Sequence, residues 1–123
     1  MRYGGGWISG LRAMRILKEY RLCEGFHGDN LTAVIDLPSD VKVIEAYCKG
    51  SVIFLMAAIN PSDSWLIKRK FMLFKDGARL PSDDELKETS LCGLVQMSGL
   101  SPIIVLECPV EEISTGDSNI VKE

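Results

Sequence analysis

The most concentrated positive charge in the sequence is a run of three basic residues that lies between aromatic ones. Cationic side chains bind phosphate and carboxylate groups, and aromatic rings stack on bases, so the combination suits a nucleotide, a nucleic acid or an acidic protein. A further arginine follows across a predicted turn. The predicted ligand-binding or partner-binding residues are Trp65, Lys68, Arg69, Lys70, Phe71 and Arg79. The same run is also typical of an edge strand that lysine protects from aggregation, and the acidic net charge favours this second interpretation.

A second cluster of chemically active side chains is acidic and lies at residues 83–85. A small hydrolase or nuclease would require the fold to bring His27, the only histidine, or Cys23 to these carboxylates. Ser82 with Glu85 three residues later is typical of a helix capping box, and the helix dipole favours acidic residues in a first turn. We therefore expect solvated carboxylates and a solvated loop histidine, and we predict no catalytic residue.

The cysteines do not show the spacing of a metal site. None of the four lies two to four residues from another, whereas zinc ligands usually do. A cysteine inside an apolar strand is most often a small buried hydrophobe. We predict neither a metal nor a cofactor, and we expect reduced, structural thiols at Cys23, Cys48, Cys92 and Cys108.

Length and composition indicate one globular domain. The chain has 123 residues, of which 46% are hydrophobic and 25% are charged. Its net charge of −3 makes nucleic acid an unfavourable partner. The longest uncharged apolar run, at 50–59, is too short to span a bilayer, and the glycines at 4–6 interrupt any signal-peptide pattern. We therefore expect a cytoplasmic protein with no membrane partner.

The most apolar stretch, residues 41–59, predicts a β-hairpin around which the other elements pack. Lys49-Gly50 is the expected two-residue turn, which places Tyr47 opposite Val52. The second strand is apolar on both faces, so a second sheet, a helix or another subunit should cover each face. This pattern predicts a homodimer or higher homo-oligomer. One face of the predicted hairpin carries Ile44, Ala46, Ile53 and Leu55.

The remaining apolar runs predict five more strands, separated by turns rich in Pro, Gly, Asn and Asp. With the hairpin they make seven strands, and one helical turn is expected at 81–88. This pattern predicts an all-β, mainly antiparallel fold, either a small sandwich or an open barrel. The domain should cover 14–109, between a flexible leader at 1–13 and a disordered acidic tail at 110–123. The other strands are predicted at 14–22 (or a short helix there), 31–37, 65–74, 90–98 and 102–107.

The order of these pieces resembles a family of short uncharacterised proteins of bacteria and their phages. The resemblance covers roughly 14–107 and rests on the Ile-Asp-Leu-Pro segment at 35–38, the hairpin, the basic strand and the closing hairpin. In that family a leucine- or methionine-proline turn precedes a β-hairpin, and an Arg/Lys-rich strand and a terminal hairpin follow. Here Lys-Asp-Gly at 75–77 stands where the family has a glycine-threonine-glycine turn. The resemblance implies no activity, but it favours a phage or mobile-element origin.

These observations lead us to expect a non-enzymatic binding protein. Given the resemblance, it would be a phage or mobile-element accessory protein that sequesters or blocks a host component, either a nucleotide or a protein, in the host cytoplasm. A structural protein that assembles into homo-oligomers is the first alternative. A small hydrolase or nuclease is the second.

Overall fold

A computed structural model of the chain describes residues 14–97 and 99–109. The leader expected at 1–13 and the tail expected at 110–123 lie outside the described residues. The elements within them are β1 (Ile16–Glu24), β2 (Asn30–Pro38), β3 (Val41–Lys49), β4 (Val52–Ile59), β5 (Leu66–Lys75), α2 (Asp83–Lys87), β6 (Ser90–Val95) and β7 (Ile103–Glu107). Each predicted strand and the predicted helical turn is therefore present, and the short helix considered for 14–22 is a strand.

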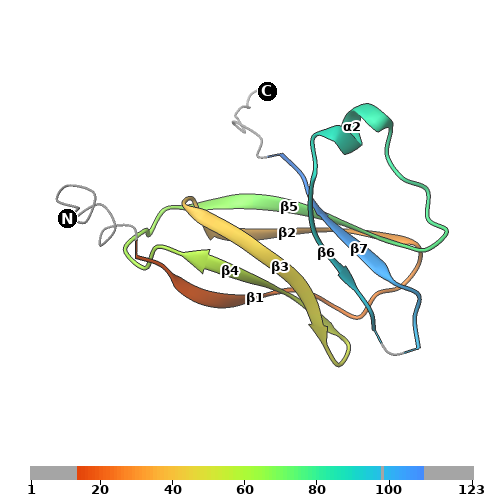
Figure 1. Cartoon of the computed structure of the whole chain (residues 1–123), viewed down its shortest axis with the longest axis horizontal. Helices are drawn as coiled ribbons and strands as arrows, with labels where there is room; N and C mark the ends of the chain where they lie inside the picture. The colour runs from red at the N-terminus through yellow and green to blue at the C-terminus, as the bar shows by residue number, and fades with distance from the viewer. Residues whose placement is uncertain (1–13, 98, 110–123) are drawn as a thin grey trace, which may run out of the picture.

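The strands form two antiparallel sheets that pack face to face, as Figure 1 shows. The smaller sheet has the order β1-β4-β3, and the larger has the order β2-β5-β7-β6. The prediction of an all-β, mainly antiparallel fold is confirmed, and of its two forms, sandwich or open barrel, the two sheets form a sandwich. The one helix within the described residues, α2, lies in the connection between β5 and β6.

The core lies between the two sheets and follows from the alternation of side chains along each strand. On β4, every second residue from Ile53 to Ile59 is buried, while the residues between them are half-buried. The larger sheet contributes buried residues from its two middle strands, β5 and β7. The largest fully buried side chains are Phe71, Leu37, Ile53, Leu55, Leu73, Ile103, Val95 and Val105.

The central hairpin forms as predicted, but its register is shifted by two residues. Lys49 lies opposite Val52, so the turn is Gly50-Ser51 rather than Lys49-Gly50, and Tyr47 lies opposite Phe54. Gly50 has a φ of +61° at the first turn position, where primed hairpin turns require a positive φ. The predicted register was wrong because a glycine was placed at the second turn position instead of the first.

A β-bulge at Ile44 changes which residues of β3 face the core. The pairing register shifts between Val43 and Glu45, and Ile44 is exposed, although the sequence pattern placed it on the same face as Ala46. After the bulge, Ala46 faces the core with Ile53 and Leu55, the residues with which the sequence pattern grouped it. A bulge inserts one unpaired residue and so reverses the inward and outward alternation beyond it.

The outer face of β4 is covered by long side chains from its neighbouring strands. The Tyr47 ring stacks on Phe54 with centroids 6.0 Å apart, and Lys49 Nζ lies 4.8 Å from the Phe54 ring centre. The Tyr47 hydroxyl donates to Glu19, and Lys49 forms an ion pair with Glu19 at 3.0 Å. The hydrogen bond to the Glu19 carboxylate raises the pKa of Tyr47 to about 12. The second sheet thus covers the inner face as expected, whereas flanking side chains, not a helix, shield the outer face.

Gly93 of β6 lies close against Ala46 of β3, on the other sheet. A Cβ atom at this position would lie 2.8 Å from the carbonyl oxygen of Ala46 on β3. That separation is too short for two non-bonded heavy atoms, and a backbone carbonyl in a paired strand cannot move aside easily. Gly93 therefore allows β3 and β6 to pack along one side of the sandwich.

Gly93→Ala should destabilise the fold by about 1–3 kcal/mol, because the added methyl group forces β3 and β6 apart. Urea unfolding would measure the loss. The matched control is Leu94→Ala on the exposed face of the same strand, which should change stability by no more than about 0.5 kcal/mol. Equal midpoints for Gly93→Ala and the unsubstituted protein would contradict this account of the contact.

Candidate functional site

The basic run lies on β5, and strand alternation separates its side chains onto two faces. Lys68 and Lys70 are exposed on the outer face of the larger sheet, whereas Arg69 and Phe71 point between the sheets. Phe71 is fully buried in the core, so it does not belong to a ligand-contacting surface. The sequence grouped these residues by proximity along the chain, but the period of two divides them.

Arg69 forms an ion pair with Glu107, across the β5–β7 pairing. The two side chains retain only 13% and 12% of their exposure. Burial, and then the nearby Glu107 charge, raise the pKa of the neighbouring Cys92 thiol to about 11. Because the Arg69 charge is largely buried and paired with Glu107, Arg69 is a structural residue and not part of the predicted contact surface.

β5 is not an edge strand, because it lies between β2 and β7. The edge-strand interpretation of the basic run is therefore wrong for the strand as a whole. However, β7 pairs only with Phe71–Lys75, whereas β2 pairs with Leu66–Phe74. Within the described residues, the half of β5 that carries the two outward lysines has a strand neighbour on one side only.

Trp65 immediately precedes β5, and its side chain is 73% exposed although its backbone is held on both sides. Its N–H donates to Asp63 Oδ1 at 3.0 Å, and its carbonyl accepts from the Ser39 N–H at 2.7 Å. The first contact spans two residues, as in an Asx-turn. An exposed aromatic ring on a fixed backbone is preorganised for contact, because little backbone entropy is lost on binding.

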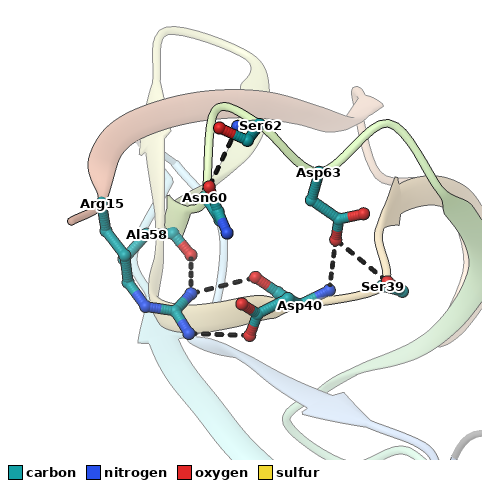
Figure 2. A network of polar contacts seen from close by, with 7 residues as sticks. All are labelled: Arg15, Ser39, Asp40, Ala58, Asn60, Ser62 and Asp63. Atoms are coloured by element: carbon teal, nitrogen blue, oxygen red, sulfur yellow. Dashed lines mark hydrogen bonds and ion pairs between the residues drawn. The ribbon is translucent and has the colours of Figure 1, made fainter. Parts of the chain in front are cut away.

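The fixed backbone around Trp65 belongs to a polar network at this end of the sandwich (Figure 2). The second oxygen of Asp63 accepts from the Ser39 hydroxyl at 2.9 Å and from the Asp40 N–H at 2.8 Å. Arg15 forms an ion pair with Asp40 at 2.7 Å and donates to the Ala58 carbonyl at 3.2 Å. The network therefore joins the start of β1, the β2–β3 turn, the end of β4 and the loop before β5.

Two apolar side chains that the sequence did not single out lie beside the outward lysines. Val34 of β2 pairs with Lys70, and Leu66 is the first residue of β5; both are exposed. The only sequence signal for this patch is the position of Val34 in the alternation of side chains along β2, which places it on the exposed face. We call these five residues the β5 surface: Trp65, Leu66, Lys68, Lys70 and Val34.

The two outward lysines have different surroundings. Lys68 forms an exposed ion pair with Asp36 at 3.2 Å. Lys70 lines a cleft of about 580 Å³ that Met72, the acidic side of α2, Cys108 and Pro109 also line. Arg79 lies in the loop after the opposite end of β5, and the seven residue steps from Lys68 to Lys75 alone span about 23 Å of strand. The sequence suggested that Arg79 lies next to the basic run. In the structure, Arg79 is therefore not adjacent to Lys68.

The acidic residues of α2 have the structural role that the sequence predicted. Ser82 Oγ accepts from the Glu85 N–H at 3.3 Å and Glu85 Oε1 accepts from the Ser82 N–H at 3.2 Å, which confirms the capping box. Cys23 packs against the core between the sheets, whereas the α2 carboxylates border a cleft on the outer side of the larger sheet. The fold therefore does not bring Cys23 to these carboxylates, which removes one of the two pairings that a hydrolase would need.

The other site predictions concern metals, disulfides and membranes. The four cysteines all lie in the described residues, and no disulfide joins them. Between residues 14 and 109, with residue 98 left aside, no cluster of His, Cys, Asp or Glu is arranged to hold a metal ion. The same part of the chain contains no helix with the length and apolar character to cross a membrane.

Comparison with protein-family models, with curated proteins and with solved structures finds no match to this chain.

Arg69→Met should destabilise the protein by about 3–5 kcal/mol, because Glu107 would keep a buried charge without its partner. Arg69→Met combined with Glu107→Met should be less destabilised than the single variant, since neither charge remains. Urea unfolding of the two single variants and the double variant gives the coupling energy. A double variant whose loss of stability equals the sum of the two single losses would show that the two charges are not coupled.

Asp63 makes the network at the Trp65 end sensitive to acid. Hydrogen bonds from the Asp40 and Trp65 N–H groups, and then from the Ser39 hydroxyl, lower the pKa of Asp63. Because the folded pKa lies below the unfolded value of about 3.9, the network stabilises the fold above that value and is lost as pH falls through the folded pKa. Unfolding free energy should therefore fall less between about pH 6 and about pH 3 in Asp63→Asn than in the unsubstituted protein. Parallel pH profiles for the two proteins would refute this role.

Proposed function

We propose that this chain is a non-enzymatic binding protein that uses the β5 surface to contact an acidic protein partner. The observation that supports this most directly is Trp65, whose ring is exposed while both backbone polar groups are hydrogen-bonded. Tryptophan is strongly enriched among the residues that dominate binding energy at protein interfaces. Two outward lysines and two exposed apolar side chains lie on β5 and the neighbouring β2. This combination matches protein interfaces, which have an apolar centre and a polar rim.

The exposure of these side chains favours a macromolecular partner over a nucleotide. Small ligands are usually bound in concave sites that enclose most of their surface. Trp65 projects into solvent, and the Lys68 side chain is 77% exposed, so neither encloses a small molecule. The lysines select a partner with negative charge, and the chain's own charge of −3 disfavours a long nucleic acid.

The resemblance in strand order favours an accessory protein of a phage or mobile element. In that setting, the acidic partner would be a host protein that this chain sequesters or blocks in the host cytoplasm. Binding that depends on one surface suits such a role, because a blocking protein needs affinity and no chemistry of its own.

Assembly into homo-oligomers is the second candidate, and a separate surface favours it. Leu91 and Leu94 are exposed on β6, and Leu80 is exposed in the loop that follows β5. Leu80 and Leu94 also line an apolar groove with Phe74 and Ile104. Exposed apolar patches that continue into a groove are typical of interfaces between proteins.

Reversing the charge of the outward lysines should abolish partner binding without unfolding the protein. Lys68→Glu with Lys70→Glu places two negative charges against an acidic partner, so proteins that the unsubstituted chain retains from a bacterial extract should be lost. Trp65→Ala should weaken their retention by about tenfold or more. Quantitative mass spectrometry of the retained proteins measures both effects.

The matched control is Lys42→Glu with Lys87→Glu, which changes the net charge equally at exposed positions outside the β5 surface. This control should retain the same partner as the unsubstituted chain. Equal loss in both double variants would reject the β5 surface as the contact site. Native mass spectra of the same samples also report oligomer mass, so a stable homo-oligomer that lacks a partner would favour the second candidate.

A further inference from the structure

The first half of β5 has an open side at which strand pairing stops. β7 pairs with β5 as far as Phe71, and the Cys108 N–H then donates to the Lys70 carbonyl at 2.9 Å. The next residue is Pro109, which has no N–H to continue the ladder. Beyond this point, among residues 14–97 and 99–109, only β2 pairs with Leu66–Arg69.

The directions of the backbone groups along this half of β5 follow from the hydrogen bonds at its two ends. The Lys70 carbonyl points toward the β7 side, and the Trp65 carbonyl points toward Ser39 on the β2 side. Backbone groups alternate between the two sides of a strand, so those of Leu66 and Lys68 face the open side. Each of these residues offers one N–H donor and one carbonyl acceptor there.

The side chains along the open side indicate which strand would fit. Lys68 and Lys70 line its outer face, whereas the inner face carries the half-buried Ile67 and Arg69, whose charge is already paired with Glu107. A complementary strand therefore places carboxylates on the outer face and apolar side chains on the inner one, in strict alternation. A second copy of β5 fits poorly, because its own lysines would face these lysines.

We propose that an extended acidic segment of the partner binds the β5 surface by β-strand addition along the open side of β5. This inference rests on the proposed function and specifies its mode of recognition. Main-chain hydrogen bonds to Leu66 and Lys68 supply the affinity, and the outward lysines select carboxylates. Trp65 lies at the end of this binding track and packs on the apolar part of the segment that extends past Leu66.

Binding is tested with a fluorescein-labelled, acetylated and amidated peptide of alternating glutamate and valine, measured by fluorescence anisotropy with the full chain. Methylation of the peptide nitrogens at alternate residues removes donors from one edge while the side chains are kept. The methylated peptide should bind about tenfold more weakly or worse, as should a peptide of alternating lysine and valine. Equal binding of the methylated and unmethylated peptides would overturn strand addition.

The chain itself offers a matched pair of variants for the same test. Lys68→Pro removes the N–H that faces the open side, whereas Lys68→Ala removes the same charge and keeps that N–H. The proline variant should bind the glutamate–valine peptide about tenfold more weakly than the alanine variant, and equal affinity would overturn the proposal. If the proline variant does not fold, hydrogen exchange of the unsubstituted chain decides: the Leu66 and Lys68 amides should become protected when the peptide binds, and unchanged exchange would overturn the proposal.

The remaining outcomes separate this inference from the proposed function. Loss of the extract partner in the double lysine variant, together with no binding of any peptide, would keep the β5 surface and reject strand addition. Protection of the Leu66 and Lys68 amides without peptide, lost in Glu111→Lys with Glu112→Lys, would make the occupant a segment of this chain and overturn the proposal of a partner strand. Retention of the extract partner in the double lysine variant would reject the proposed function itself.

Discussion

The two-residue period of β5 is the constraint on which both the core and the candidate surface depend. The same strand supplies Phe71 and Leu73 to the space between the sheets and presents Lys68 and Lys70 to solvent. A shift of one residue in its pairing with β2 would exchange these two sets and bury two lysines in place of the aromatic centre of the core. The register of β5 is therefore fixed by the cost of burying charge, and the outward position of the lysines follows from the burial of Phe71.

The network around Asp63 shows how a short polar loop positions an aromatic side chain. One carboxylate accepts hydrogen bonds from Ser39, Asp40 and Trp65, which lie on two separate connections. Arg15 adds the start of β1 to the same end of the sandwich. The exposed ring thus stands on backbone that four chain segments hold, although its own side chain contributes little to the core.

The sequence predicts the strands well because apolar alternation and turn residues are local signals. The capping box of α2 is predicted to the residue, since Ser82 and Glu85 satisfy each other's backbone within one helical turn. The register of the hairpin is less accessible, because Gly50 can occupy either turn position and only packing decides between them. The bulge at Ile44 has no local signal, so its exposure could not be foreseen.

The candidate site is predicted only in part, for reasons that lie outside the basic run. Neighbouring charges in sequence do not reveal that Glu107, on a strand from the end of the domain, forms an ion pair with Arg69. The partial cover of β5 likewise depends on where β7 ends, which no pattern in β5 itself encodes. The exposed Trp65 and the outward lysines were identifiable, whereas the open strand side between them required the topology.

The strand order also has a consequence for how the chain assembles. Among the described strands, only β3–β4 and β6–β7 are hairpins between sequence neighbours, whereas β1 pairs with β4 and β2 pairs with β5. During synthesis, the smaller sheet is complete once Ile59 has emerged, but the larger sheet that covers its apolar inner face is complete only when β7 has been made. Long-range pairings of this kind slow folding, and the uncovered face is then the surface most prone to misassociation. The nascent chain is therefore most prone to misassociation late in synthesis, between completion of the fourth strand and completion of the seventh.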